Sequence, residues 1–336
     1  MEKIGYTLNQ HIGDGRRRFP EFTDKLSTLL VQMAFSAKIL AREFGRSALV
    51  GKLGLTGGKN PTGDTQKILD VFSNEIIIEA FAKTGLVAAI VSEELDEVKF
   101  LTCQTDARYI LCIDPLDGSS NTDINGGIGT IFGIYQRKSG DCPVPVEEFF
   151  RKGSDQVAAG YVMYGPGTVL VYTIGHGVHG FTLDHDLGEF LLSHENIRCP
   201  VRGVTCSANL ARFSQWPPNV QKFVESLTGR DHSKEQCYSL RYAGALVVDL
   251  HRVLLEGGVY FYPEDAGHKE GKLRLLYECA PLAFLVEQAG GRASTGTQRI
   301  LDIQAESIHQ RAPLVIGSTE EVSLYEKFSA MHEQDQ

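Results

Sequence analysis

Residues 114–121 read Asp-Pro-Leu-Asp-Gly-Ser-Ser-Asn, and they follow the apolar run Tyr109–Ile113, which is short and rich in strand-favouring residues. Two carboxylates therefore lie where a predicted strand ends and a turn begins. Mg²⁺ commonly binds one or two carboxylates together with phosphate oxygens of a substrate. The hydroxyls and N–H groups of residues 118–121 suit a phosphate. A solvated acidic turn is the alternative interpretation, and the rest of the chain decides between the two.

Composition and charge narrow the class of protein. The chain has 336 residues, which suffices for two domains or two fused halves, and its 42% hydrophobic content is ordinary for a globular protein. The net charge of −9 argues against nucleic-acid binding, and the triplet Arg16–Arg18 is too short to reverse this. No apolar run approaches the roughly 18 residues of a membrane span. We therefore expect a cytoplasmic protein without nucleic-acid or membrane partners.

The seven cysteines suggest neither a zinc site nor a disulfide framework. Their number is odd, no CxxC pair occurs, and several lie inside apolar runs, as Cys112 does. We therefore expect buried, reduced thiols. The segment 175–180, Gly-His-Gly-Val-His-Gly, lacks an acidic or cysteine partner at ligand spacing, so we expect a turn between strands rather than a metal site.

A second strand is predicted to end in acidic residues. The apolar run Leu86–Val91 is followed by Ser-Glu-Glu at residues 92–94. In layered α/β proteins, functional sites are assembled at strand ends. Upstream, residues 64–83 predict a helix in which Asp70 stands between apolar neighbours, so that its carboxylate is either paired or functional. The glycine-rich residues 48–63 predict a flexible surface loop beside this site.

The remaining patterns predict alternating helices and strands. Helices are expected over 21–44, 218–227, 239–256 and up to Gly290, and strands over 128–135, 157–164, 168–174, 189–193 and 259–262. A boundary near Asn196 divides an N-terminal metal-binding catalytic half, residues 1–196, from a C-terminal sugar-phosphate-binding half, residues 197–336. Basic and aromatic residues in the second half suit a phosphate ester, although surface ion pairs are an alternative.

Six segments carry a resemblance to a known family. They are GDTQKILDVFSNE at 63–75, VSEE at 91–94, DPLDGSSNTDINGGIGTIFGIY at 114–135, VAAGYVMYG at 157–165, RYAGALVVDLHR at 241–252 and GKLRLLYECAP at 271–281. The chain resembles the class I fructose-1,6-bisphosphatases of the lithium-sensitive, metal-dependent phosphomonoesterase superfamily. This resemblance implies an α/β fold with α-β-α-β-α layers and two fused halves.

The resemblance also implies roles for individual residues. The metal-binding positions are matched by Glu93, Glu94, Asp114, the Leu116 carbonyl, Asp117 and Glu278. Asp64 and Asp70 match acids that position the attacking water or the catalytic metal. We expect Asp70 and Glu94 to orient or deprotonate that water, with Asp64 supporting them. The turn around the 1-phosphate is matched by Gly118, Ser119 and Ser120. The contacts to the sugar and the 6-phosphate are matched by Asn209, Arg241, Tyr242, Tyr262 and Lys272.

The implied activity is hydrolysis of the 1-phosphate of fructose 1,6-bisphosphate with about two or three Mg²⁺ ions per subunit, Mn²⁺ being possible. The family's equivalent of Arg241 reaches in from a neighbouring subunit, which implies a homotetramer. Sedoheptulose 1,7-bisphosphate, alone or alongside the fructose ester, is an alternative substrate. A catalytically silent sugar-phosphate-binding protein is the alternative from another class.

The chain departs from the family pattern at several positions. Arg212 stands where many members have a tyrosine that contacts the 6-phosphate, and Leu246 replaces a common methionine against the sugar. Residues 18–23 lack the glycine-rich form that binds AMP, and Gln136 replaces a common AMP-contacting arginine, while Arg108-Tyr109 fits that site. AMP inhibition is therefore left open. The cysteine-bearing insertion of plastid members is absent from the sequence, so we expect no thiol regulation.

Overall fold

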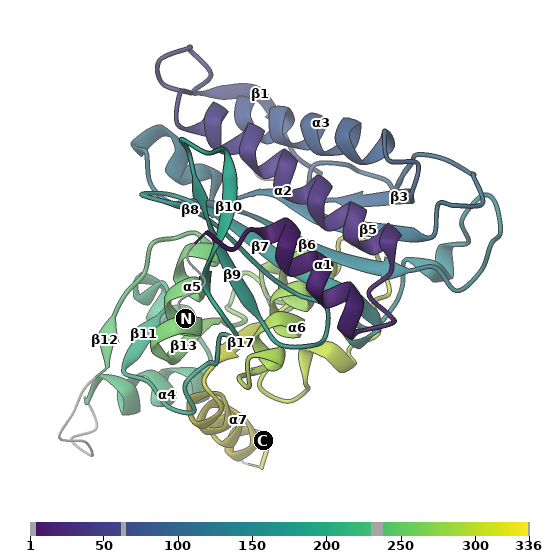
Figure 1. The fold of residues 1–336 in the computed structure, drawn as a ribbon. Coiled ribbons are helices and arrows are strands. Elements are labelled where there is room, and N and C mark those ends of the chain that lie inside the picture. Colours follow the sequence, from purple (N-terminus) through teal and green to yellow (C-terminus); the bar gives the residue numbers. More distant parts are fainter. Residues whose placement is uncertain (1–4, 62–64, 230–237, 335–336) are drawn as a thin grey trace.

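An eight-stranded sheet organises the first part of the chain (Figure 1). The computed structural model describes residues 5–61, 65–229 and 238–334. Strands β3 and β5 pair in parallel, and the other neighbours in this sheet pair antiparallel. In sheet order, the strands are β10 (Glu189–His194), β9 (His179–Asp184), β8 (Thr168–Thr173), β7 (Gln156–Tyr164), β6 (Ile128–Gln136), β5 (Tyr109–Asp117), β3 (Val87–Ser92) and β4 (Lys99–Phe100).

A second sheet, of five strands, organises the later part of the chain. Its order is β12 (Ser239–Leu240), β11 (Thr205–Ser207), β13 (Gly258–Tyr262), β17 (Leu314–Gly317) and β15 (Arg292–Ser294). Two small antiparallel pairs accompany the sheets: β1 (Leu55–Lys59) with β2 (Thr65–Lys67), and β14 (Leu273–Arg274) with β16 (Arg311–Ala312). Both sheets are covered by helices on their two faces.

Successive side chains of a strand point to opposite faces, and three buried clusters follow from this alternation. Leu111 packs with α1 (Leu8–Arg18), α2 (Asp24–Phe44) and α3 (Ile68–Ala82) on the outer face of the large sheet.

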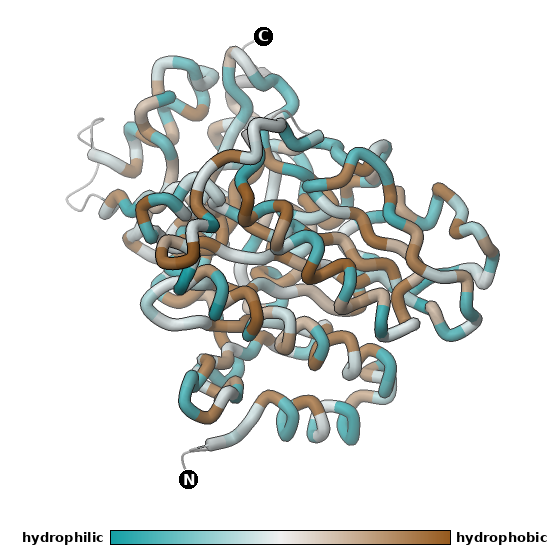
Figure 2. The backbone as a smooth tube through the Cα atoms, turned by 90° about the horizontal axis from the view of Figure 1, so that it is seen from above, coloured by the Kyte–Doolittle hydropathy of each residue, from teal (hydrophilic) through white to brown (hydrophobic). Residues whose placement is uncertain are grey.

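The neighbouring residue Cys112 packs with α5 (Leu246–Glu256) and α6 (Ala280–Gln288) between the sheets. Phe261 packs with α4 (Pro218–Thr228) and α7 (Thr319–Gln334) on the far side of the small sheet. In Figure 2 long apolar stretches run along the strands in the middle of the molecule. The predicted α-β-α-β-α layering is confirmed.

Several predicted elements differ at their ends. The helix predicted over 239–256 begins only at Leu246, because Gly244 is left-handed (φ 79°) and residues 239–240 form β12. The Asp249 carboxylate accepts the N–H groups of Ala243 and Gly244 at 2.8 and 3.1 Å and fixes this bend. Residues 175–178 form the expected turn, but the strand β9 that follows was not predicted. The predicted loop over 48–63 contains β1, which pairs with β2 ahead of α3.

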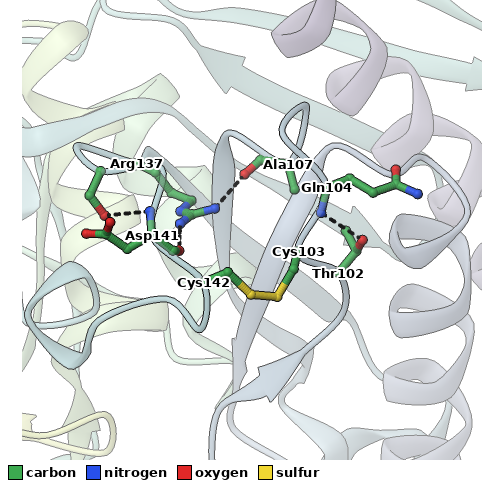
Figure 3. Close-up of a disulfide and its surroundings, with 8 residues drawn as sticks. Thr102, Cys103, Gln104, Ala107, Arg137, Asp141 and Cys142 are labelled. Atoms are coloured by element: carbon green, nitrogen blue, oxygen red, sulfur yellow. Dashed lines mark hydrogen bonds between the residues drawn. A yellow bond between two sulfur atoms is a disulfide. The ribbon is translucent and has the colours of Figure 1, made fainter.

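The prediction of reduced thiols is wrong for one pair of cysteines. Cys103 and Cys142 form a disulfide (Figure 3). They precede β5 and follow β6, and because these strands are antiparallel neighbours, the two loops lie at the same end of the sheet. Nearby, Arg137 Nη1 donates to the Ala107 carbonyl at 3.0 Å and also links these loops. The thiols of Cys112, Cys199, Cys206 and Cys279 are free and buried, as expected, and Cys237 lies outside the described residues.

The length and hydropathy of the helices bear on whether the described part of the chain could cross a membrane. Within residues 5–61, 65–229 and 238–334, no helix combines the length and the apolar character that crossing a membrane requires.

Candidate active site

Two acidic side chains meet where the parallel strands β3 and β5 lie side by side. The register places Ser92 opposite Ile113, and the Glu93 N–H continues the pairing by donating to the Ile113 carbonyl at 3.2 Å. This register brings Glu93 next to Asp114, and their carboxyl groups share a hydrogen bond. The structure thus unites two acidic strand ends that the sequence places about 20 residues apart, a separation that a parallel β crossover readily spans.

Asp117 joins the large sheet to helix α5. Its Oδ1 accepts the N–H of Leu246 at 3.0 Å, and its Oδ2 accepts the N–H of Val247 at 2.7 Å. The first N–H groups of a helix have no partner inside the helix, and the helix dipole favours a negative charge there. The carboxylate therefore satisfies two exposed donors while it stays at the wall of the cavity. Leu246, a predicted sugar contact, lines the same cavity.

The turn after Asp117 requires glycine, because any other residue at position 118 would force the backbone to shift. Gly118 is left-handed (φ 75°), and a Cβ atom there would lie 2.4 Å from the Cβ of Ala245. The 3-10 turn η1 (Ser119–Ile124) follows, and the Thr122 hydroxyl donates to the Ser119 carbonyl at 2.8 Å. Gly118, Ser119 and Ser120 line the cavity as a rigid turn of the kind that binds a phosphate.

Glu278 reaches the acidic cluster from the second part of the chain. It lies on the π-helical turn η5 (Leu275–Cys279) between β14 and α6, a rare geometry that is frequent at functional sites. Its buried carboxylate accepts the N–H of Arg274. Its charge raises the pKa of Glu93, second only to the effect of burial, so the two carboxylates are near neighbours. The structure therefore brings Glu278 into the same acidic cluster as Glu93 and Asp114.

Burial and mutual repulsion both act on these acids. Burial, followed by the neighbouring carboxylates, raises the pKa values of Glu93 and Asp114 well above their usual range. Burial raises the pKa of Asp117 to about 6 and that of Glu278 to about 7. Burial likewise raises the pKa of Asp70 to about 7, although a hydrogen bond from Lys67 opposes the shift. Ionisation of all these acids together is therefore unfavourable, even with Lys67 and Arg274 beside them.

The donor set suits hard divalent cations, because such ions bind carboxylate and carbonyl oxygens. Within the described ranges, however, no three acidic, histidine or cysteine side chains already converge as ligands of one ion. Glu93 and Asp114 contact each other, while Asp117 and Glu278 accept backbone N–H groups. Each carboxylate oxygen has a second lone pair, so these bonds leave room for a cation. The oxygen atoms of these residues are therefore suitable ligands for divalent cations.

One cavity of about 570 Å³ contains most of the predicted site. The residues that were predicted for the site and that line this cavity are Asp70, Glu93, Glu94, Asp114, Leu116, Asp117, Gly118, Ser119, Ser120, Asn209, Arg212, Tyr242, Leu246, Tyr262, Lys272 and Glu278. Arg241 is exposed and is not part of this lining, and its Nη1 donates to the Leu240 carbonyl at 2.8 Å. Asp64 lies outside the described residues. Leu55 and Asn60 of the predicted loop reach the cavity wall.

Two family models cover nearly the whole chain. "Fructose-1-6-bisphosphatase, N-terminal domain" matches residues 6–195, and "Fructose-1-6-bisphosphatase, C-terminal domain" matches residues 199–330. The chain belongs to the fructose-1,6-bisphosphatase family. The resemblance seen in the sequence is thereby confirmed, and the enzyme class that it implied is confirmed with it.

Individual relatives are similar to this chain over nearly their whole length. The chain is 58% identical over 323 residues to the class 1 fructose-1,6-bisphosphatase 2 of Acaryochloris marina, covering 96% of each chain. It is 47% identical to the class 1 enzyme of Chlorobium chlorochromatii, covering 96% of this chain and 97% of that one. The crystal structure of Leishmania major fructose-1,6-bisphosphatase in holo form superposes with a TM-score of 0.91 at 39% identity, over 96% of this chain and 98% of that chain.

One residue of this fructose-1,6-bisphosphatase site was missed by the sequence analysis. Lys67 is buried at the wall of the cavity, and its Nζ lies 2.7 Å from Asp123 Oδ2 and 3.2 Å from Thr122 Oγ1. Its backbone N–H donates to Asp70 Oδ2 at 2.7 Å. Lys67 therefore ties the start of α3 to the turn η1. The only hint of this role in the sequence is a lysine directly before an apolar helix, and such a lysine alone does not indicate a functional residue.

Replacing Lys67 by methionine is expected to lower kcat/KM for the phosphate ester by about 10- to 100-fold, as is typical for partners that orient the ligands of a metal site. The change keeps the side-chain length but removes the bonds to Asp123 and Thr122, so the phosphate turn and α3 lose their link. Steady-state kinetics measure the effect. Lys83→Met is the matched control, because Lys83 pairs with Glu79 on the surface. Wild-type kcat/KM in Lys67→Met would contradict the assignment.

Proposed function

We propose that this chain hydrolyses the 1-phosphate of fructose 1,6-bisphosphate to give fructose 6-phosphate and phosphate, with divalent cations held by its acidic cluster. One observation carries the proposal: the carboxylates, the glycine-serine turn and the basic and aromatic side chains line a single cavity. In this proposal the carboxylates form an acidic end of the cavity, and the basic and aromatic side chains form a basic end. Such a pair of ends would match a substrate with phosphates at both ends. Membership of the family supports the same substrate.

The acidic end would hold the cations and the reacting phosphate. We assign the ligands to Glu93, Glu94, Asp114, the Leu116 carbonyl, Asp117 and Glu278. When bound, Mg²⁺ or Mn²⁺ would neutralise phosphate oxygens and make a water more acidic, and about two or three ions are expected per subunit. The N–H groups of residues 118–120 face this phosphate in the proposal and hold it in place.

Proton transfer at this end is assigned to Asp70 and Glu94. A general base works best when its pKa lies near the working pH, and burial raises the pKa of Asp70 to about 7. Asp70 is held by the Lys67 N–H, and Glu94 Oε2 accepts a hydrogen bond from Gln66 Nε2 at 2.7 Å. These contacts would orient both carboxyl groups toward the attacking water. Asp64 keeps the supporting role that the family resemblance implies.

The basic end would bind the sugar and the second phosphate through Asn209, Tyr242, Tyr262 and Lys272. We further propose a homotetramer in which Arg241 of a neighbouring copy completes this end. The exposed position of Arg241 supports this arrangement, because the adjacent Tyr242 lines the cavity while Arg241 does not. The division at residue 196 into a metal-binding and a sugar-binding half remains part of the proposal.

The cytoplasmic location also remains an expectation. The Cys103–Cys142 disulfide weighs against it, because cytosolic thiols are normally kept reduced. Peptide mapping of protein isolated with its thiols blocked would show whether this bond exists in the cell.

The test is phosphate release from fructose 1,6-bisphosphate and from sedoheptulose 1,7-bisphosphate, with Mg²⁺, Mn²⁺ or neither, and with added AMP. The proposal predicts cation-dependent release from the fructose ester. Faster release from the sedoheptulose ester would favour the alternative substrate. Binding of either ester without any release would support the silent sugar-phosphate-binding protein and overturn the proposal.

A further inference from the structure

Arg212 reaches the wall of the cavity from a short 3-10 turn, η4 (Leu210–Gln215). The turn begins at Asn209, whose Oδ1 accepts the N–H of Ala211 at 3.3 Å. The Arg212 side chain is 35% exposed, so its guanidinium is open to the cavity and is not buried in the core. The sequence thus places a fork of several N–H donors where many family members have a tyrosine.

Asp265 holds this guanidinium from behind. Arg212 Nη1 lies 2.9 Å from Asp265 Oδ2, and the Asp265 side chain is only 2% exposed. Asp265 lies in the loop after β13 and, among the residues that the structure describes, it stands outside the lining of the cavity. The carboxylate therefore supports Arg212 without itself presenting a negative charge to a ligand.

The carboxylate of Asp265 is itself fixed in direction. Its Oδ1 accepts the N–H of Gly267 at 2.8 Å and lies 3.0 Å from His268 Nδ1. These contacts leave Oδ2 facing Arg212. A guanidinium that is already held along one edge loses less rotamer freedom when it binds an anion, so part of the entropic cost of binding is removed.

A purely structural role explains this arrangement less well. Arg212 lines the same cavity as Lys272 and Tyr262, and it lies on η4, an element that carries none of the clustered carboxylates. The two cationic side chains Arg212 and Lys272 together suit the two negative charges of a phosphate monoester.

We propose that Asp265 is a positioning residue that orients Arg212 as a donor to the distal phosphate, and that this pair makes the site selective for sugars phosphorylated at both ends. The inference rests on the proposed function, because it concerns the second phosphate of the same substrate. Arg212 touches the substrate, whereas Asp265 acts through Arg212.

The test compares fructose 1,6-bisphosphate with fructose 1-phosphate, which lacks the distal phosphate. Arg212→Met is expected to raise KM for the bisphosphate by about 10- to 100-fold, the effect of losing a charge-assisted hydrogen bond, with kcat nearly unchanged. The same variant should leave kcat/KM for fructose 1-phosphate at the wild-type value. Arg212→Lys, which keeps the charge but loses the fork, should give an intermediate KM.

Asp265→Asn is expected to raise KM for the bisphosphate by a smaller factor, and the double variant should be no worse than Arg212→Met alone. Arg252→Met is the matched control, since Arg252 pairs with Glu256 on the surface. Equal losses on both substrates, or an unchanged KM in Asp265→Asn, would overturn the inference. If the wild type releases phosphate from neither ester, it is the proposed function that fails.

Discussion

Glu93→Gln is expected to lower kcat for cation-dependent phosphate release by about 1,000-fold, the equivalent of roughly 4 kcal/mol of transition-state stabilisation. The glutamine has the same shape but lacks the negative charge that Mg²⁺ binds most strongly. Glu93 also contacts Asp114, so the change removes one proposed ligand and disturbs a second. A phosphate-release assay over a range of Mg²⁺ concentrations measures both effects.

The thermal stability of Glu93→Gln separates loss of a ligand from loss of the fold. Glu93 is half-buried at the cavity wall beside Glu278, Glu94 and Asp114, and desolvation and the neighbouring carboxylates make its charged form costly. In EDTA the variant should therefore be at least as stable as the wild type. Added Mg²⁺ should raise Tm of the wild type, because a cation that binds only the folded state stabilises it, and should raise Tm of the variant much less. A variant that is unstable in EDTA would contradict this account of the cluster.

Asp117→Ala is expected to remove activity and also to destabilise the protein by about 3 kcal/mol or more, since each lost charge-assisted hydrogen bond contributes about 1.5–3 kcal/mol. The carboxylate accepts the N–H groups of Leu246 and Val247, so its loss leaves two donors of α5 without their partner. For a chain of 336 residues, the expected fall in Tm is about 4–9 °C, because the entropy of unfolding grows with chain length.

Asp117→Asn is the matched control for that prediction. Its amide oxygen still accepts one of the two N–H groups of α5, so its Tm should fall less than that of Asp117→Ala. Its activity should remain very low, because the negative charge beside the phosphate turn is gone. A wild-type Tm in Asp117→Ala, measured by calorimetry, would show that this carboxylate does not hold α5 against the large sheet.

Local patterns in the sequence predicted many of the helices and strands and the acidic strand ends, whereas the layering was implied by the family resemblance. Buried strands such as β3 are short apolar runs, and helices such as α2 show a regular apolar face, so both are visible without any long-range contact. The family resemblance then predicted that Glu278 and Asp114 belong to one metal site, which local patterns could not predict. The structure places both residues at one cavity.

Features that depend on pairing across the fold were not predictable in this way. The Cys103–Cys142 bond needs the antiparallel register of β5 and β6, and the anchoring of Asp117 needs the position of α5. The strand β9 was missed because its histidine and glycine residues resemble a turn when read alone. The support of Arg212 by Asp265 joins two loops that are separated by 53 residues, and no local pattern relates them.

The central claim is that carboxylates from distant parts of the chain bind divalent cations at the glycine-serine turn. The most direct measurement is an anomalous difference map from crystals grown with Mn²⁺, fructose 6-phosphate and phosphate. The account predicts Mn²⁺ peaks at bonding distance from Asp114, Glu93 and Glu278, with phosphate on the turn at Gly118. A fully occupied phosphate on that turn with no Mn²⁺ bound to any of these carboxylates would contradict it.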